Sequence, residues 1–260
     1  MKNTRSTLAC LVITLLLASC GKDYVSNTGT GTNAGTSGSL ARFAISNNTL
    51  YTVSDGSSNS STFFTTAGNN LTSYDITDNT NPVVQKTSAT RSGAVETIFG
   101  FQNYLFIGSQ NGMDIFDATN PSAPVYKSSY THVKSCDPVV ANANYAFVSL
   151  RSSSACTMGL NEIDVVDISN PALPKQVYTY PMTQPYGLAL DGNYLFVCDG
   201  GVKFYDITNV ASPTLKQKVV IDARDVIVQN GKLMVIGTDG LYQYDYSGGS
   251  LILLSKIPTK

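Results

Sequence analysis

Beyond residue 40, the chain alternates apolar and polar residues in short runs that are separated by Gly, Asn, Asp and Pro. Alternation with a period of two predicts β-strands that place one face against a core. In residues 187–220, the runs GLAL, YLFVC, VKFYDI and LKQKVV are separated by DGN, DGG and TNVASPT. Short Gly- and Asn-containing segments of this kind favour hairpin turns. This segment therefore predicts four antiparallel strands joined in order.

The same four-strand pattern recurs along the chain. Its clearest landmark is the Asp that ends each third strand, and these residues are separated by 42, 50, 39 and 39 residues: Asp75, Asp117, Asp167, Asp206 and Asp245. A repeated four-stranded antiparallel unit of about 40 residues is typical of a β-propeller blade. We therefore predict an all-β fold, a closed five-bladed β-propeller over residues 40–260. A sandwich does not explain one motif repeated five times, and an open array should have atypical end repeats.

The turn after each third strand has its own chemistry. The segments IFDATNPSAP, VVDISNPALP and FYDITNVASP begin at residues 115, 165 and 204. An Asp at a strand end can accept main-chain N–H groups in an Asx turn, and Pro cannot continue a sheet ladder. We interpret the motif as a device that ends one strand and directs the chain to the next. The alternative is metal binding, for example by Asp75 with Asp78, but a motif repeated in every unit favours architecture, so no metal or cofactor is predicted.

These segments, together with ARDVIVQNGKLMVIGTDGLYQYD near the C-terminus, resemble the LVIVD repeat of bacterial extracytoplasmic propellers. The resemblance covers residues 40 to about 258 and implies a propeller fold. It implies little about function, because proteins with this repeat are mostly uncharacterised. The sequence departs from the pattern at Val210, where Pro is expected, and in the last copy, which lacks the Asn-Pro pair.

The N-terminus predicts export and lipidation. Lys2 and Arg5 precede an apolar run, Leu8–Leu17, that is too short to span a membrane, and LASC follows it. This order resembles a bacterial lipoprotein signal sequence, which implies cleavage of residues 1–19 and acylation of Cys20. An ordinary secretory signal is the alternative. Residues 20–39 are rich in Gly, Ser, Thr and Asn and predict a flexible tether. We expect an outer-membrane lipoprotein of the bacterial envelope, either periplasmic or surface-exposed.

Composition excludes several functions. Charged residues make up 13% of the chain, the formal net charge is −1 and no basic block occurs, so nucleic acid is not an expected partner. His132 is the single His, and Glu96 and Glu162 are the two Glu residues. No GxSxG segment or His cluster at metal-ligand spacing is present. No catalytic residue is therefore predicted.

A binding site is expected on one face of the propeller. The links from strand four to the next strand one share this face with the turns between strands two and three, and loops on a rigid scaffold carry recognition. Two long loops, residues 54–70 and 150–161, fall there. The first strands direct side chains to the same place, the mouth of the central channel. The ligand-binding candidates are Arg42, Glu96, Asp137, Tyr186, Arg224 and Asp225.

Three functions remain open. The favoured one is a lipid-anchored binding module for a glycan, a peptide or a partner protein, with Tyr186 stacking on the ligand. The alternative is a polysaccharide hydrolase or lyase that uses Glu96 with Asp137 and Arg224. An enzyme should bring these three into one pocket with a perturbed carboxylate, and a binding module need not. A purely structural surface protein would have no pocket, and Arg224 and Asp225 would then form a structural pair.

The cysteines are consistent with an oxidising compartment. Cys136 and Cys156 are expected on the loop-rich face, so they are the candidate disulfide pair. Closing a loop of about 20 residues would contribute about 3 kcal/mol in the chain-entropy account. Cys198 ends a predicted strand and is expected to be a buried thiol.

Overall fold

The chain forms five four-stranded antiparallel sheets, each a meander in sequence order. The computed structural model describes residues 39–55, 68–132, 138–152 and 160–259. Within these residues every regular element is a strand, and no helix is long and apolar enough to cross a membrane. The five sheets confirm the predicted all-β fold of five four-stranded blades.

The blades are numbered along the chain. Blade 1 contains β1 (Phe43–Ser46), β2 (Thr49–Ser54), β3 (Asn70–Asp75) and β4 (Val83–Ala89). Blade 2 contains β5 (Val95–Phe101), β6 (Tyr104–Ser109), β7 (Gly112–Asp117) and β8 (Val125–Thr131). Blade 3 contains β9 (Val139–Ala141), β10 (Tyr145–Leu150), β11 (Glu162–Asp167) and β12 (Lys175–Pro181). Blade 4 contains β13 (Leu188–Asp191), β14 (Tyr194–Cys198), β15 (Val202–Asp206) and β16 (Thr214–Val219). Blade 5 contains β17 (Ala223–Gln229), β18 (Lys232–Gly237), β19 (Gly240–Asp245) and β20 (Ile252–Pro258).

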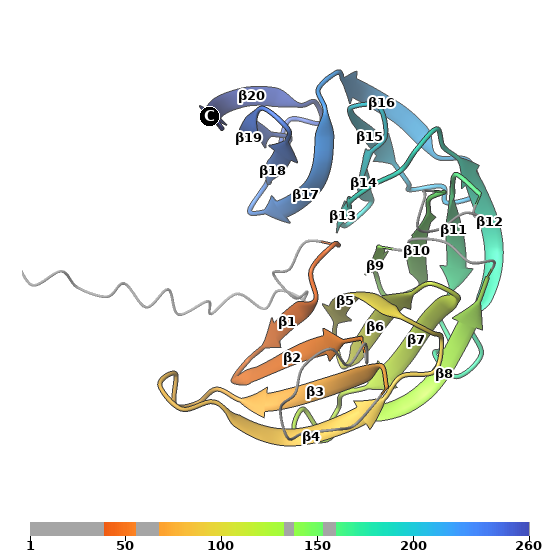
Figure 1. Ribbon diagram of the computed structural model, residues 1–260. Helices are drawn as coiled ribbons and strands as arrows, with labels where there is room; N and C mark the ends of the chain where they lie inside the picture. The colour runs from red at the N-terminus through yellow and green to blue at the C-terminus, as the bar shows by residue number, and fades with distance from the viewer. Residues whose placement is uncertain (1–38, 56–67, 133–137, 153–159, 260) are drawn as a thin grey trace, which may run out of the picture. The chain divides into compact units, whose positions relative to one another are not determined.

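The first strand of each blade lies innermost and the fourth lies outermost (Figure 1). Consecutive blades contact each other through their inner strands, as β1 does with β5 and β13 with β17. Strand β9 is buried along its whole length, as expected for a strand covered on both faces, whereas β20 is exposed throughout. The core therefore lies between the blades, near the centre of the arrangement.

Alternate residues of each second strand fill these interfaces. In blade 2, Leu105 and Ile107 pack toward blade 1, and Phe106 packs toward blade 3. Phe147 and Phe196 hold the position of Phe106 in blades 3 and 4, and all three side chains are buried. Large apolar side chains at the same register position thus bind each blade to the next one, which is the main stabilising contribution expected from burial.

The packing between consecutive blades does not continue between blade 5 and blade 1 within the described residues. Ile236 occupies the register position that is buried as Cys198 in blade 4, yet it is 52% exposed. On the corresponding face of blade 1, Phe43 and Ile45 are exposed. Within the described residues, blades 5 and 1 therefore lack the extensive sheet-on-sheet packing that joins the other consecutive blades, because these apolar side chains are exposed. A link from Ser39, described below, joins the start of blade 1 to blades 4 and 5.

The turn motif has the predicted hydrogen bonds in all five blades. The Oδ1 atom of the strand-ending Asp accepts the main-chain N–H two residues later, at 2.8–2.9 Å in every blade. In Asp206, Asp75, Asp117 and Asp167, hydrogen bonds from the residue two positions on hold the pKa of the carboxyl below its usual value. In Asp245 the hydrogen bond from Lys232 lowers the pKa most, and those from Ser247 lower it further. Asp78 likewise accepts the N–H of Thr80, at 2.9 Å. The Asx-turn prediction is confirmed.

Candidate functional site

The loop face of the propeller, defined here as the ends of the blades that carry the turns between strands two and three and the links between blades, holds a cavity of about 230 Å³. The cavity lies between blades 4 and 5. It is lined by the link before β13, the turn after β14 and the start of β17, and the side chains that matter below are Tyr186, Asp199, Asp222 and Arg224. Two of the predicted candidates, Tyr186 and Arg224, therefore meet at one site.

A β-bulge directs Arg224 to this site. The register of β17 against β18 shifts between Ala223 and Asp225, so Arg224 has no partner in the ladder. Glu96 is the extra residue of the equivalent bulge in β5, between Val95 and Thr97. A bulge bends the strand and re-aims the extra side chain. The sequence pattern predicted both residues at the channel mouth, but it could not show that each would leave the ladder.

Tyr186 is the centre of a cationic cluster. The guanidinium carbon of Arg151 lies 4.5 Å from the centroid of the Tyr186 ring, and that of Arg224 lies 4.8 Å from it. The main chain of Tyr186 is fixed, because its N–H donates to the carbonyl of Cys198 at 2.8 Å. Arg224 also contacts the carboxylate of Asp222 at 3.1 Å, with both side chains largely exposed. We call Tyr186, Arg151 and Arg224 the Arg–Tyr–Arg cluster.

The link that carries Tyr186 is held by a buried ion pair. The Asp199 carboxylate has no exposed surface and receives Lys203 Nζ at 2.6 Å. It also accepts the main-chain N–H groups of Gln184, at 2.7 Å, and Thr183, at 3.1 Å. Burial acts to raise the pKa of Asp199, but these hydrogen bonds outweigh it and hold the pKa below its usual value. Asp199 therefore remains ionised and fixes the segment just before Tyr186.

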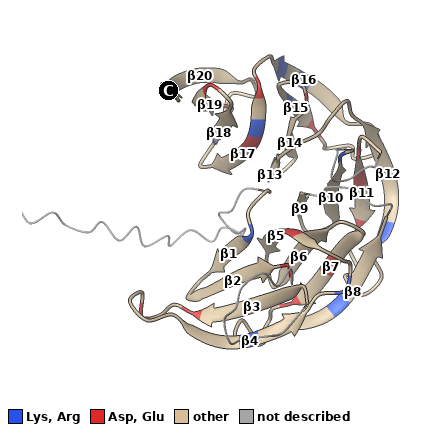
Figure 2. Ribbon diagram, in the orientation of Figure 1, with Lys and Arg blue, Asp and Glu red and all other residues tan. Residues whose placement is uncertain are grey.

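Asp225 points away from the cavity. Its Oδ1 atom accepts the hydroxyl of Ser39 at 3.4 Å and the N–H of Val226 at 2.9 Å. Ser39 Oγ in turn accepts the N–H of Leu188 at 2.6 Å, so the buried Ser39 joins the start of blade 1 to blades 4 and 5. Burial raises the pKa of Asp225 to about 6, although its hydrogen bonds act to lower it. On β17, a basic and an acidic position lie side by side (Figure 2), but Arg224 pairs with Asp222 and not with Asp225.

The remaining candidates do not join this site. Arg42 lies 3.5 Å from Asp55 in an exposed pair, and Glu96 is not among the residues that line the cavity. The convergence that a hydrolase would need is therefore not seen for Glu96 and Arg224. Four further candidates lie outside the described residues: Asp137, the disulfide candidates Cys136 and Cys156, and the acylation candidate Cys20.

The sequence reasoning missed three residues of the site: Arg151, Asp199 and Asp222. Arg151 and Asp199 each stand just after a second strand, in SLR and VCD, and the ladder register places other residue types at these two positions in the other blades. This break in the repeat was the available signal. Cys198, expected as a buried thiol, is fully buried, and burial raises the pKa of its thiol. No group of three or more His, Cys, Asp or Glu side chains that could hold a metal ion occurs in the described part of the chain.

Comparisons with known proteins agree with this architecture. The model of the LVIVD repeat matches residues 93–132, 135–181 and 186–220, which correspond to blades 2, 3 and 4. The sequence matches no curated protein.

The fold of this chain resembles those of several solved structures. A functionally unknown protein from Desulfotomaculum acetoxidans is similar with a TM-score of 0.65 and 13% identity over 84% of this chain and 69% of that one. A periplasmic gluconolactonase from Pseudomonas aeruginosa gives a TM-score of 0.60 and 11% identity over 82% and 69% of the two chains. BamB from Moraxella catarrhalis gives a TM-score of 0.52 and 15% identity over 85% of this chain and 62% of that one. At these identities the likeness concerns the fold alone. The repeat match and the five sheets together identify a five-bladed β-propeller that carries LVIVD repeats in blades 2, 3 and 4.

Proposed function

We propose that this propeller is a lipid-anchored binding module of the bacterial envelope, and that its Arg–Tyr–Arg cluster recognises a carboxylate group of a peptide or an acidic glycan. The single observation that carries the ligand class is the placement of two guanidinium groups against the ring of Tyr186, a residue that lines the cavity together with Arg224. The proposed anchor rests on the LASC segment and on Cys20.

The chemistry of the cluster favours a planar anion. Arg presents a rigid fork of donors that matches a carboxylate with two parallel hydrogen bonds. A guanidinium over an aromatic ring is attracted to the ring by about 0.5–1 kcal/mol at an exposed site, which limits its rotamers before the ligand arrives. Tyr186 thus limits the rotamers of both Arg151 and Arg224.

The charge balance at the cavity supports the same ligand. Asp199 is neutralised by Lys203, and Asp225 is directed toward Ser39. Asp222 is the acidic partner that a ligand carboxylate would replace on Arg224. Exposed pairs of this kind contribute about 0–1 kcal/mol, so the exchange costs little.

The size of the cavity limits what can enter it. Pockets that enclose a drug-sized ligand measure roughly 300–1,000 Å³, and this cavity measures about 230 Å³. It would therefore hold a terminal group of a larger ligand, with the rest lying along the loop face. A hydrolase or lyase is less favoured, because Asp199, with its lowered pKa, is a poor proton donor and Glu96 does not line the cavity.

The ligand class can be tested with the full-length chain and two matched peptide libraries, one with free C-terminal carboxylates and one with amides, together with oligogalacturonides. We expect binding by the free acids or the uronides, at least tenfold weaker for Arg224→Gln and Arg151→Gln, and weaker in high salt. Arg42→Gln is the control, since Arg42 is also exposed and paired with an Asp. Equal affinity for acids and amides, or unchanged affinity in Arg224→Gln, would reject the assignment.

The anchor has a separate test. Radiolabelled palmitate supplied to expressing cells should label the wild-type chain and leave Cys20→Ala unlabelled, and the variant should leave the membrane fraction. Labelling that survives in Cys20→Ala would show that the anchor is wrong while leaving the carboxylate site untouched.

A further inference from the structure

A second and larger cleft lies at the other end of the blades, on the turn face, which we define by the turns between strands one and two and between strands three and four. It has a volume of about 640 Å³, within the range of pockets that enclose small ligands. Blades 3 and 4 provide most of its wall, and Phe101 of blade 2 completes it. Its position opposite the loop face makes it independent of the Arg–Tyr–Arg cluster.

The lining of this cleft is polar and uncharged. None of the residues that line it is Asp, Glu, Lys or Arg. Its polar side chains are mainly amides and include Asn142, Asn144, Asn193, Thr208 and Asn209. Its aromatic residues are Phe101, Tyr145 and Tyr178. An ionic ligand would find no counter-charge here, and a purely apolar ligand would bury amides without partners.

Hydrogen bonds within the turns fix the amides and leave complementary groups for a ligand. Asn142 Oδ1 accepts the N–H groups of Asn144 and Tyr145, at 3.0 and 2.8 Å, and Asn209 Oδ1 accepts that of Ala211 at 3.2 Å. Asn193 uses its Nδ2 group, which donates to Thr208 Oγ1 at 3.2 Å. Asn142 and Asn209 therefore retain N–H donors, and Asn193 retains a carbonyl acceptor.

Tyrosine side chains gather at the same cleft. The Tyr180 hydroxyl donates to the carbonyl of Val210, a lining residue, at 2.5 Å. Burial raises the pKa of Tyr180, and the phenols of Tyr178 and Tyr145 raise it further. Tyr178 is 39% exposed, so its ring is available to a ligand.

We propose that this cleft, which we call the turn-face cleft, binds a neutral oligosaccharide. A sugar hydroxyl is both a donor and an acceptor, and fixed amides that offer one of each complement it. The C–H faces of a sugar ring are apolar and pack on aromatic side chains. Amides, aromatic rings and the absence of charge thus point to one ligand class.

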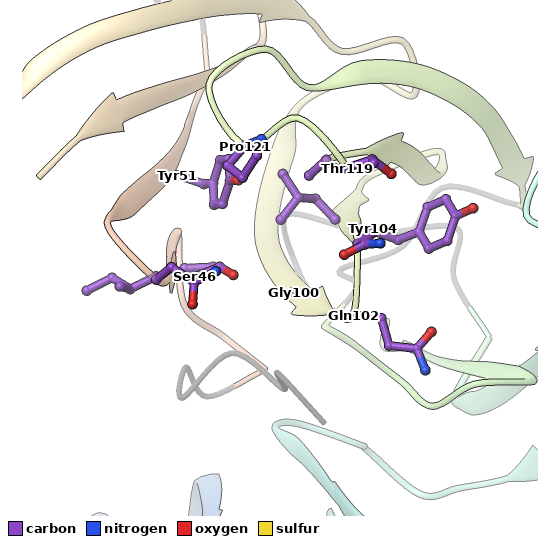
Figure 3. Close-up of a pocket in the computed structure, with 13 residues that line it drawn as sticks. Ser46, Tyr51, Gly100, Gln102, Tyr104, Thr119 and Pro121 are labelled. Atoms are coloured by element: carbon purple, nitrogen blue, oxygen red, sulfur yellow. The ribbon is translucent and has the colours of Figure 1, made fainter. Parts of the chain in front are cut away.

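A smaller cleft between blades 1 and 2 provides an internal comparison (Figure 3). Its volume is about 160 Å³, and it is also lined by amides and hydroxyls, including Ser46, Gln102 and Thr119. In Figure 3, however, the ring of Tyr104 points away from Ser46 and Tyr51. Tyr51, the other aromatic residue of this cleft, is buried, and the cleft is small, so we expect it to bind no sugar.

The test uses the full-length chain with maltotriose, cellotriose, triacetylchitotriose and, as an acidic counterpart, trigalacturonate. Saturation-transfer NMR detects binding, and calorimetry gives the affinity. We expect at least one neutral trisaccharide to bind, with affinity at least tenfold lower in Tyr178→Ala and severalfold lower in Asn144→Ala. Asn48→Ala is the matched control, because Asn48 holds the equivalent turn position in blade 1 but lines neither cleft.

Thermal unfolding of each variant separates loss of the site from loss of the fold. Arg224→Gln should leave neutral-sugar binding unchanged. Failure of the sugar proposal can therefore be distinguished from failure of the carboxylate proposal. The proposal is overturned if no neutral trisaccharide binds at millimolar concentration, or if a folded Tyr178→Ala binds as well as the wild type. It is also overturned if Asn48→Ala weakens binding as much as Asn144→Ala does.

Discussion

Replacing Asp199 by Ala should destabilise the propeller more than any change to an exposed charge. The substitution leaves Lys203, which is 16% exposed, without its partner and removes the acceptor of the Thr183 and Gln184 N–H groups. Breaking a buried pair from one side costs about 3–5 kcal/mol. We expect the lower end, about 3 kcal/mol, because water still reaches Lys203. For a domain of this size, that corresponds to a fall in Tm of about 6–12 °C.

Urea unfolding followed by circular dichroism measures this loss. Asp55→Ala is the control, since its pair with Arg42 is exposed on both sides, and it should change the unfolding free energy by less than about 0.5 kcal/mol. In the double variant Asp199→Ala, Lys203→Met, the unpaired charge is gone, so part of the stability should return. A loss below about 1 kcal/mol in Asp199→Ala, or no recovery in the double variant, would refute the buried-pair reasoning.

The stability contributed by the Asp199 carboxylate should depend on pH, and the sign of that dependence follows from its pKa. The pKa of folded Asp199 lies below its usual value of about 3.9, so the carboxylate stabilises the fold above that pH. The contribution is lost as the pH falls through the folded pKa. The difference in unfolding free energy between wild type and Asp199→Ala should thus be constant from about pH 5 to 7 and shrink below about pH 4. A difference that widens in acid would contradict the assignment.

Two further substitutions test close packing and a buried hydrogen bond. Gly187→Ala would place a Cβ 2.0 Å from Asp225 Oδ1 and 2.7 Å from its Cα, so urea unfolding should show a loss of about 1–3 kcal/mol. Gly100→Ala, whose Cβ would meet its nearest atom at 3.7 Å, is the control, and equal losses would count against the packing argument. Tyr130→Phe removes the 2.7 Å bond to buried Asp164 and should cost about 1.5–3 kcal/mol in the same assay. Tyr126→Phe, with a 3.2 Å bond to Ser129, should cost less, and the reverse order would show that the Asp164 bond contributes little.

The fold was predictable from the sequence because its signals are local. Asp206 and its four equivalents each accept the main-chain N–H two residues later, so the turn can be recognised from neighbouring residues in the sequence. The strands follow from a period-two pattern that is complete within each repeat. These features depend on the chain near them and not on how the blades meet.

The junction between the first and last blades could not be predicted in the same way. Ile236 and Phe43 continue the apolar alternation of buried positions in the other blades, yet both are exposed. The pattern reports which face of a strand is apolar, but it does not report whether another sheet covers that face. The same limit applies to the bulges at Glu96 and Arg224, because a register shift in one strand is defined only against the neighbouring strand.

The two proposed sites lie where the repeat is broken. The Asp199–Lys203 pair and Arg151 have no equivalents in the other blades, and they hold and flank Tyr186. Val210 stands where the motif has Pro, and its carbonyl receives the Tyr180 hydroxyl at the turn-face cleft. Residues that every blade needs are constrained by folding, whereas a residue found in one blade alone must be explained by its own contacts. In a repeat protein of this kind, departures from the motif are therefore the most direct guide to where ligands bind.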